Sequence, residues 1–586
     1  MQILKHHVLP LVEKALAHVG IEASNVEAIL QPAREVDQGD LSLPCFPFAK
    51  IVGKAPAAIA EEVAEALGEH TCIGEVNAVN GYLNIKADPT WLAEQVLGGH
   101  LAQANPRQER HVLIEHTSAN PNGPFHVGRA RNAILGDTLV RLNRLWGHQV
   151  TAEYYVDDMG KQVAVLAWAL EHMTHEQVEQ ALTGRESANP QWEAKADHVR
   201  VRWYQAAQAL RKESEEAAAI EESIGALVHA SEHGDQSALK AFEDAYQPVL
   251  DGMLETLGRL GIKFDRFTKE STFVTNGEVG ELMQTLQALD IDGTAENGAH
   301  FLDLGQRGLK GKTEFFYRRG DGSSLYATRD IAYHRWKWSQ SNELVNVLGE
   351  DHKLQAQQVG LTLEELGLRR PEVVFYSFIK LPEGKMSTRR GNVVYMDDLL
   401  EEAKAHAAEV VATLRPEYDS EQVEHIAEAV GTSAVRFNII NVSPEKGFTF
   451  RWEDALSFES GSAPFIMYSH TRACSIRSKV ESFTGQSDAS TTVPVPSGPY
   501  PEGLVNLLRT MAVHDDRLER VVREHRPHLF AEQLLQLANA YNGFYRDCHV
   551  IVESEVNAFY FALSEAARVM LKKGMEGLGI VPLESM

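Results

Sequence analysis

Two short polar segments, each directly after an apolar stretch, place the strongest constraint on the fold of this 586-residue chain. The first is Phe-His-Val-Gly-Arg-Ala-Arg-Asn, which carries His126 and follows a strand predicted at residues 111–115. The second is Gly-Lys-Met-Ser-Thr-Arg-Arg-Gly at residues 384–391, which follows a strand predicted at residues 372–380. Either segment alone is a weak signal. Together, at the carboxyl ends of two strands, they predict a parallel sheet with a split nucleotide site at its topological switch point.

The periodicity of apolar residues around these segments predicts the rest of an α/β unit. The expected elements are helices at 127–146 and 353–367 and strands at 149–156 and 344–349. Residues 165–300 are rich in Glu and Ala and predict a mainly helical insertion. We expect a Rossmann-type parallel-sheet catalytic domain, an N-terminal α+β module and a C-terminal all-α helical bundle, with the ranges 106–400, 1–105 and 401–586.

Composition excludes several other classes of protein. No apolar run approaches the ~20 residues that span a bilayer, and the first residues lack a signal-peptide cleavage pattern, so we expect a cytoplasmic protein without membrane attachment. The four cysteines form no Cys-x-x-Cys pair, and we expect free thiols and no structural metal. The net charge of −26 argues against a general nucleic-acid coat, but it leaves open a selective RNA partner held by local basic patches.

The two polar segments have the residue types that adenylyl transfer needs. His126 and the backbone near Gly128 lie at a predicted helix N-terminus, where free amides and the helix dipole attract phosphate. Gly128 has no side chain, so a flat base can lie against the backbone there. Lys385 offers a mobile positive charge to phosphates in a transition state. The chain has no Gly-x-x-x-x-Gly-Lys-Ser/Thr sequence, which argues against a P-loop enzyme.

The chain resembles the class I aminoacyl-tRNA synthetases in HVGR (126–129) and KMSTR (385–389), and longer blocks narrow the resemblance to the arginyl-tRNA synthetase family. These blocks are EHTSANPNGPFHVGRARNAILGD (115–137), YATRDIAY (326–333), VLGEDHKLQAQQ (347–358), GKMSTRRGNVV (384–394), YSHTRACSIRSK (468–479), GDLSLPCFPFAK (39–50) and the segment closing at Met586. The resemblance implies ATP with Mg²⁺, arginine and tRNA-Arg as substrates, and pyrophosphate exchange that needs tRNA.

The resemblance also implies roles for single residues. ATP would be bound by His126, Gly128, Lys385, Ser387 and Arg389. Arginine would be bound by Glu115, Asn120, Tyr326, Asp330 and His352. Two carboxylates and a hydroxyl suit a planar cation with five donors. Without the resemblance, Asp330 would be interpreted as a helix-cap or surface acid, and Tyr326 as an aromatic residue that packs in the sheet.

Two positions depart from the family pattern. Arg129 stands where the first signature has its second histidine, and Thr388 stands where the later segment has its second lysine. Relatives that lack this lysine often carry one just before the first signature, but here Gly123 occupies that place. We therefore expect Arg129 and Arg389 to meet the phosphates. The alternative is that both arginines face solvent.

The C-terminal helical region resembles the family's anticodon-binding bundle. Tyr545 matches a position that stacks on the anticodon loop, and His549 stands where some relatives have tryptophan. A spacing of four predicts that both lie on one helix face, where aromatic rings can stack on bases. The alternative is two aromatics that face the core. Residues 1–100 resemble the module that touches the corner of the tRNA.

We expect an arginine–tRNA ligase, acting as a monomer through an arginyl-adenylate. No editing domain is apparent, and a pocket specific for a guanidinium makes one unnecessary. A small-molecule nucleotidyltransferase is the first alternative, and the two additional domains argue against it. The second is a catalytically silent paralogue that binds RNA. Arg129 favours the silent paralogue, whereas His126, Lys385 and Asp330 argue against it.

Overall fold

The computed structural model forms two compact units. The structure describes residues 1–22, 24–33, 38–99, 109–183, 189–380, 394–457, 461–485, 493–553 and 555–586. One unit consists of Met1–Gln108, Ser457–Glu576 and Val581–Met586, and the other of Glu109–Leu456 and Gly577–Ile580. These units do not coincide with the three predicted domains, whose boundaries stay predictions. Among the described helices, none has both the length and the apolar character that crossing a membrane requires.

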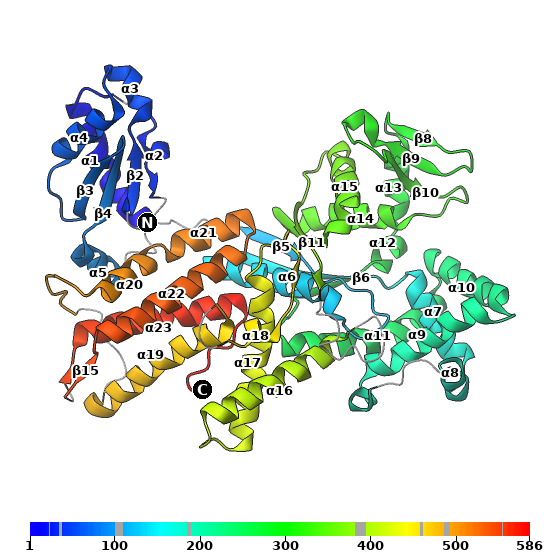
Figure 1. Ribbon diagram of the computed structural model, residues 1–586. Coiled ribbons are helices and arrows are strands. Elements are labelled where there is room, and N and C mark those ends of the chain that lie inside the picture. Colours follow the sequence, from blue (N-terminus) through cyan, green and yellow to red (C-terminus); the bar gives the residue numbers. More distant parts are fainter. Residues whose placement is uncertain are drawn as a thin grey trace. The chain divides into compact units, whose positions relative to one another are not determined.

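A five-stranded parallel sheet forms the centre of the second unit (Figure 1). Its strand order is β12-β11-β5-β6-β7, so the chain runs outward from β5 to one edge and then returns to β11 on the other side of β5. The topological switch point therefore lies between β5 and β11, as the predicted Rossmann-type sheet requires. The strands are β5 (His111–Glu115), β6 (Gln149–Val156), β7 (Arg266–Lys269), β11 (Glu343–Gly349) and β12 (Glu372–Tyr376).

Helix α6 (Val127–Trp146) packs against this sheet and fixes the first signature segment. The helix has His126 at its N-cap and ends at Gly147, whose φ of 103° is a conformation that favours glycine. The helix approaches the turn after β5 closely, because a Cβ on Gly136 would lie 2.2 Å from the His116 side chain. The shared core is apolar and includes Ile114, Leu135, Leu139, Val345 and Val347. The bounds predicted for α6, β5 and β6 are confirmed.

The strand predicted at residues 372–380 is interrupted, and this part of the prediction is wrong. The chain leaves the sheet after Tyr376, and β13 (Ile379–Lys380) pairs instead with β14 (Phe448–Thr449). Ser377 causes the break, because its backbone N–H donates to the Pro444 carbonyl and its hydroxyl to the Glu445 carbonyl. Hydrophobicity continues through this point, so the pattern of apolar residues alone did not reveal the break.

The predicted insertion at residues 165–300 is mainly helical but also supplies β7, an edge strand of the central sheet. Its strand sequence, Arg-Phe-Thr-Lys, is short and polar, which conceals it from hydrophobic patterning. The helices before it are α7 (Lys161–His172), α8 (His175–Ala181), α9 (Ala196–Glu213), α10 (Ala217–Glu232) and α11 (Gln236–Arg259). After it come α12 (Ser271–Thr275), α13 (Glu278–Gln287) and a small antiparallel sheet of β8 (Asp292–Thr294), β9 (His300–Asp303) and β10 (Glu314–Arg318).

Helices complete the second unit on both sides of the second signature segment. Before it, α14 (Tyr326–Gln340) and α15 (Lys353–Glu365) flank β11. After it, α16 (Met396–Leu414) and α17 (Ser420–Ile440) pack against each other, and α17 packs on α6. The helical character predicted past Asp397 is confirmed for α16 and α17.

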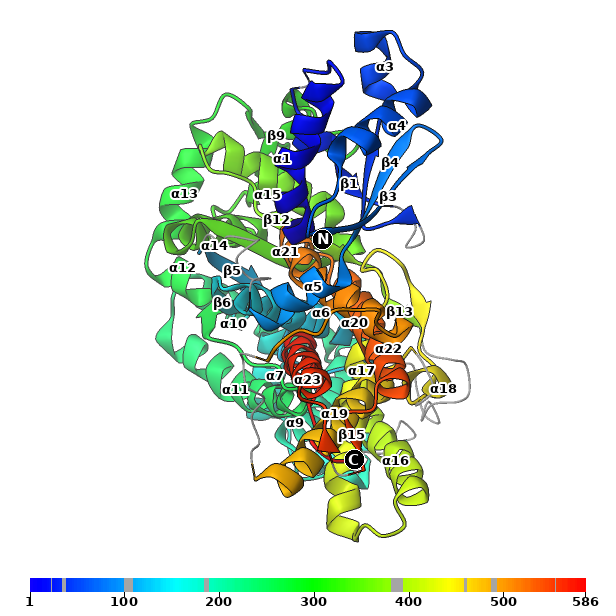
Figure 2. The same ribbon diagram turned by 90° about the vertical axis from the view of Figure 1, so that its left-hand side faces the viewer.

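The first unit contains the N-terminal α+β module. Its antiparallel sheet has the order β1-β2-β4-β3, and α4 packs on β3 and β4 while α1 packs on α4 (Figure 2). The elements are α1 (Gln2–His18), β1 (Gln31–Pro32), β2 (Leu41–Pro44), α3 (Phe46–Val52), α4 (Pro56–Leu67), β3 (Ile73–Val79), β4 (Tyr82–Ala87) and α5 (Pro89–Leu97).

The same unit contains the C-terminal helices. They are α19 (Ala463–Thr484), α20 (Glu502–Ala512), α21 (His514–Glu524), α22 (His528–Asp547) and α23 (Ala558–Leu578). A short hairpin of β15 (Ile551–Val552) and β16 (Glu555–Val556) interrupts them. The hairpin was not expected in an all-α bundle. Helix α20 is joined to the N-terminal module by an ion pair in which Arg509 Nε lies 3.4 Å from Asp40 Oδ1.

Candidate active site

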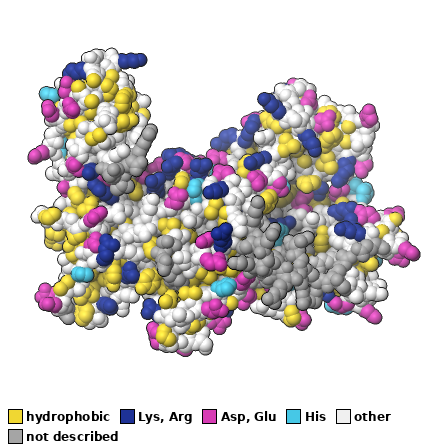
Figure 3. Space-filling model, viewed as in Figure 1, with side chains coloured by type: hydrophobic (Ala, Val, Ile, Leu, Met, Phe, Trp, Pro, Cys, Tyr) yellow, Lys and Arg dark blue, Asp and Glu magenta, His cyan; other side chains and the backbone are white. Residues whose placement is uncertain are grey.

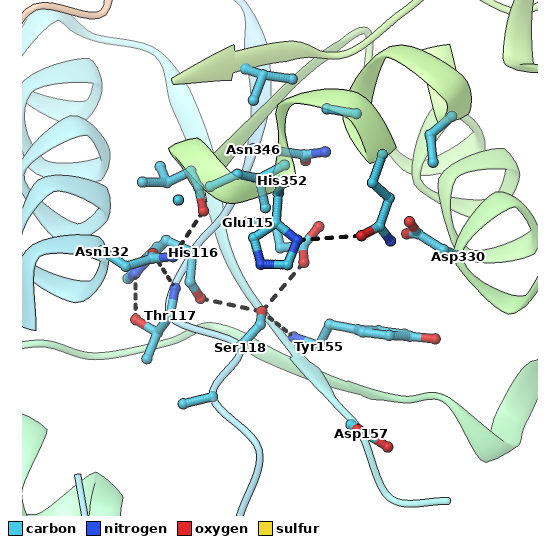
Figure 4. A pocket seen from close by; sticks show the side chains of 18 of the residues that line it. Glu115, His116, Thr117, Ser118, Asn132, Tyr155, Asp157, Asp330, Asn346 and His352 are labelled. Atoms are coloured by element: carbon cyan, nitrogen blue, oxygen red, sulfur yellow. Dashed lines mark hydrogen bonds between the residues drawn. The ribbon is translucent and has the colours of Figure 1, made fainter. Parts of the chain in front are cut away.

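A cavity of about 400 Å³ lies at the switch point of the parallel sheet. Its walls come from the turn after β5, the carboxyl ends of β6 and β11, and the helices α14 and α15. Figure 4 shows polar side chains from these elements pointing toward one another across it. A cavity at this position in a parallel sheet is where ligands of doubly wound folds bind.

Two predicted carboxylates face this cavity from different elements (Figure 4). Glu115 is the last residue of β5, and Asp330 lies one turn into α14. Asp330 Oδ1 is 3.1 Å from His334 Nδ1. Burial opposes the charged form of Asp330, but His334 and the Lys337 charge outweigh burial and hold the pKa of this carboxyl below its ordinary value. Asp330 therefore offers a carboxylate to a cationic ligand.

The other predicted arginine-binding residues also line the cavity. Tyr326 begins α14, and its side chain is 66% exposed, so it does not pack in the sheet as the alternative reading required. His352 lies between β11 and α15, with Nδ1 3.3 Å from Gln355 Oε1. Asn120 donates from Nδ2 to Gln162 Oε1 at 3.1 Å. Residues distant in sequence are thus brought to one cavity, and their individual roles stay predictions.

The first signature segment borders this site at the start of α6. Arg129 lines the cavity, whereas His126 and Gly128 are outside its lining. The His126 ring lies over Gly128, since a Cβ there would approach the ring to 3.0 Å. Burial and the neighbouring Arg129 charge lower the pKa of His126 to about 4, so the imidazole is neutral at pH 7. A neutral ring at a helix N-terminus can exchange hydrogen bonds with a phosphate or base.

The second signature segment, with the predicted residues Lys385, Ser387 and Arg389, lies outside the described residues. The chain that follows it is paired with the first signature. Val127 donates its N–H to the Val394 carbonyl at 2.9 Å, and Met396 donates to the Phe125 carbonyl at 2.7 Å. These two bonds place residue 394 directly beside the beginning of α6.

Arg131, on α6, connects this helix by hydrogen bonds to the chain around Ser377 and to residues 443–446. Its guanidinium is fully buried and donates to the carbonyls of Ser377, Ser443 and Lys446, the last two at 2.8 and 2.9 Å. The chain that precedes the second signature is therefore hydrogen-bonded to the helix that carries the first.

Some acidic residues of the cavity were missed by the sequence interpretation. Asp157 follows the end of β6, and Glu270 follows the end of β7. Burial raises the pKa of Asp157 above its ordinary value. An acid directly after the predicted strand 149–156 was a signal that could have identified Asp157. Glu270 gave no such signal, because its strand was not recognised.

The two predicted anticodon residues differ in their placement. Tyr545 is 42% exposed on α22, so it is not a core aromatic. The Arg472 guanidinium lies over its ring, 4.6 Å from the centroid. His549 is exposed, but α22 ends at Asp547, so the prediction that both residues share one helix face is wrong. The helix ends where the chain turns toward β15, which spacing alone did not reveal.

One cluster in the described part of the chain has side chains of the kind that bind metals: Asp197, His198 and Asp397. A lysine already neutralises it, because Lys195 Nζ lies 2.8 Å from Asp397 Oδ2 and 3.1 Å from Asp197 Oδ2. The cluster is thus an ion-pair network in which an ammonium takes the place of a cation. The absence of a structural metal stays a prediction. All four cysteines are free thiols, as expected.

Charges of both signs are mixed over the face seen in Figure 3, and basic side chains lie among acidic ones there. This distribution agrees with the net charge of −26 and with local rather than extended basic surfaces. Such a surface is compatible with selective contacts to RNA, and it is unfavourable for a protein that coats nucleic acids without selectivity.

Three family models match the chain. Residues 92–452 match "tRNA synthetases class I (R), catalytic domain", residues 466–586 match "DALR anticodon binding domain", and residues 6–87 match "Arginyl tRNA synthetase N terminal domain". The chain is 39% identical over 582 residues to an arginine–tRNA ligase of Methanocella arvoryzae, covering 98% of each chain. It is 37% identical over 596 residues to that of Methanosarcina acetivorans, covering 100% of each. Its fold is similar to the arginyl-tRNA synthetase of Thermus thermophilus, with a TM-score of 0.77, 24% identity and coverage of 99% and 100%.

Proposed function

The chain belongs to the arginyl-tRNA synthetase family, and from this premise we propose how its residues divide the reaction. The reaction is that of an arginine–tRNA ligase. Arginine is activated with ATP to arginyl-adenylate as pyrophosphate leaves, and the arginyl group is then transferred to tRNA-Arg.

We assign arginine to the switch-point cavity. Glu115 and Asp330 would bind the guanidinium, with the Tyr326 hydroxyl as a further acceptor, because a forked cation needs several acceptors in one region. Asn120 would contact the amino and carboxyl groups of the substrate, and His352 would close the side of the pocket formed by α15. The support is that all five side chains line one cavity.

We assign ATP to the adjoining start of α6. The neutral His126 ring and the backbone at Gly128 would contact ATP, and Arg129, Lys385, Ser387 and Arg389 would meet its phosphates. Mg²⁺ would enter with the phosphates as part of the substrate. The arginine carboxylate attacks the α-phosphate directly, so the chain needs no side-chain nucleophile, and it acts by positioning and charge stabilisation.

We assign the anticodon loop to the C-terminal helices, with Tyr545 and His549 as contacts. The support is the exposed ring of Tyr545 and the adjacent Arg472 charge. A monomeric state and a cytoplasmic location remain predictions.

The observation that carries the proposal is the pair of carboxylates, Glu115 and Asp330, at the switch point beside the first signature. The test is attachment of each of the twenty amino acids to total tRNA. We expect arginine alone to be attached, and we expect Lys385→Ala to lower kcat by about 100-fold or more, the scale of a lost transition-state charge contact. Attachment of another amino acid would refute the assignment of the pocket. No attachment at all would instead support the silent RNA-binding paralogue.

A further inference from the structure

A wholly buried lysine lies beneath the arginine pocket. Lys337, on α14, has a side chain with 0% exposure and does not line the cavity itself. Its Nζ donates to Glu115 Oε2 at 2.6 Å, Asn346 Oδ1 at 3.0 Å and His334 Nε2 at 3.2 Å. Its three donors thus have three acceptors. Burial of a charged group costs free energy unless the charge is paired and hydrogen-bonded. The three acceptors around Lys337 meet this requirement of a buried ammonium group.

His334 connects this lysine to the second carboxylate. Its Nε2 accepts from Lys337 and from Asn346 Nδ2, the latter at 2.8 Å, so the proton of the neutral ring lies on Nδ1. Nδ1 faces Asp330, 2.8 Å from its carbonyl oxygen and 3.1 Å from Oδ1. A continuous chain of hydrogen bonds therefore runs from Glu115 through Lys337 and His334 to Asp330.

The charges of this chain are unequal. By formal charge the two carboxylates, Glu115 and Asp330, contribute −2 and the Lys337 ammonium contributes +1, while the His334 ring, whose Nε2 accepts two hydrogen bonds, adds no charge to this count. The network therefore has one negative charge in excess, which is the charge that a single guanidinium neutralises. Lys337 also holds Glu115 by Oε2, while Oε1 accepts from the Ser118 hydroxyl at 3.3 Å.

We propose that Lys337 is a positioning and specificity-determining residue for arginine: it fixes the Glu115 carboxylate and sets the charge of the network from Glu115 to Asp330 to accept one monovalent cation. The inference rests on the proposed arginine pocket and deepens it. Lys337 acts through Glu115 and His334 without touching the substrate.

Other titratable groups surround these carboxylates and are the same residues in the wild type and in every Lys337 variant. Next to Glu115, the buried Glu153 on β6 is paired with Arg266 on β7 at 2.5 Å. Next to Asp330 are Gln355 on α15 and the acid Glu270, which lies 2.9 Å from Arg329. Beyond these, the cavity is lined by Arg129, Asp157 and the phenol Tyr155, whose ring stacks on that of the buried Tyr333. Lys337 is the cation that contacts Glu115 directly.

The test is the pH dependence of KM for arginine in Lys337→Met, measured by aminoacylation at saturating ATP and tRNA. Without the lysine, two carboxylates share the network with no cation between them, so one of them retains a proton to higher pH. Arginine must then displace this proton. As a result, the KM for arginine rises by up to tenfold for each pH unit below the pKa of the shared proton. We expect the ratio of KM at pH 6 to KM at pH 8 to be at least tenfold larger than in the wild type, with KM for ATP unchanged. Equal ratios would overturn the proposal.

Three further variants separate charge from packing. Lys337→Arg keeps the charge and should keep the wild-type ratio; a ratio like that of Lys337→Met would overturn the proposal. The double variant Glu115→Gln with Lys337→Met restores one excess negative charge and should return the ratio to the wild-type value. This holds even if its KM is higher at every pH. Lys195→Met removes another buried, ion-paired lysine outside the pocket and should leave the ratio unchanged.

Failure of the inference and failure of the pocket assignment have different signatures. If Asp330→Asn leaves KM for arginine unchanged, the pocket itself is misassigned. If Asp330→Asn raises that KM while Lys337→Met keeps the wild-type pH ratio, the pocket stands and the role of Lys337 is refuted.

Discussion

Asp330 offers a carboxylate at the wall of the cavity. Its carboxyl faces the cavity while His334 and Lys337 support its charged form. Asp330→Asn should raise KM for arginine about 10- to 150-fold, because a hydrogen bond to a charged group contributes about 1.5–3 kcal/mol. KM for ATP should not change. Since the pKa of Asp330 is held below its ordinary value, the wild-type contribution of Asp330 to arginine affinity should persist at pH 5.

The matched control for this substitution is Asp351→Asn. Asp351 is close in space to His352, but its side chain is 60% exposed and does not line the cavity. Kinetic constants for arginine should therefore be unaffected. Equal effects of the two substitutions would show that the pocket responds to general negative charge rather than to the Asp330 carboxylate.

His126 is a histidine that should not titrate in the physiological range. Its pKa of about 4 lies below the ordinary 6.5, so stability contributed by the neutral ring is present above pH 6.5 and is lost as pH falls toward 4. Histidine resonances followed by NMR should include one with a midpoint near 4 that is absent in His126→Gln. The same variant should flatten the stability-pH profile between 6.5 and 4. A His126 midpoint near 6.5 would contradict the buried, neutral ring.

Residues of the site were predictable where a local signal coincided with the family resemblance. Glu115 ends the apolar strand predicted at residues 111–115, so it could be placed at the carboxyl edge of the sheet, whereas Tyr326 was assigned by the resemblance alone. Lys337 could not be assigned, because its partner Glu115 is 222 positions away and only the folded sheet brings the two together. His549 was misplaced because spacing does not reveal where α22 ends.

At the scale of elements, Arg131 joins α6 to two other parts of the second unit. Arg131→Met should lower the free energy of unfolding of this unit by roughly 2–5 kcal/mol, because it leaves the carbonyls of Ser377, Ser443 and Lys446 without their donor. Chemical denaturation monitored by an intrinsic tryptophan signal measures the change. Arg144→Met is the control on the same helix. Arg144 is 45% exposed in its surface pair with Asp265, so its loss should cost less than about 1 kcal/mol. Equal losses would contradict the anchoring role of Arg131.

The elements that sequence predicted best are those whose local pattern and tertiary environment agree. Helix α6 has an apolar face, a clear beginning and Gly147 at its end, and its predicted bounds match the structure. The segment at 372–380 is mainly apolar on both sides of Ser377, yet this serine bonds to a distant loop and breaks the strand. Strand β7 is polar because it lies at an edge, and a long-range pairing with β6 defines it. Such pairings are not present in local sequence.

At the scale of the whole molecule, the residues proposed to contact the anticodon and those of the proposed arginine pocket belong to different compact units. Tyr545→Ala should raise KM for tRNA about 5- to 150-fold, because one lost base stack costs about 1–3 kcal/mol. The melting temperature should fall only modestly, since this ring is 42% exposed. Tyr541→Ala is the matched control one turn earlier on α22. Tyr541 is fully buried and bonded to Ser564, so its loss should cost about 3–5 kcal/mol of stability and leave tRNA affinity of the folded fraction unchanged.

The same variants test whether tRNA binding is needed for the chemistry in the other unit. The family resemblance implies that ATP–pyrophosphate exchange needs tRNA, so exchange by the wild type without tRNA should be negligible. With tRNA added, the concentration giving half-maximal exchange should rise in Tyr545→Ala by the same factor as KM for tRNA in aminoacylation, because one binding event governs both measurements. The maximal exchange rate and KM for arginine should stay at wild-type values. Full exchange with arginine and ATP alone would contradict this dependence, and a lower maximal rate in Tyr545→Ala would show that Tyr545 acts beyond binding.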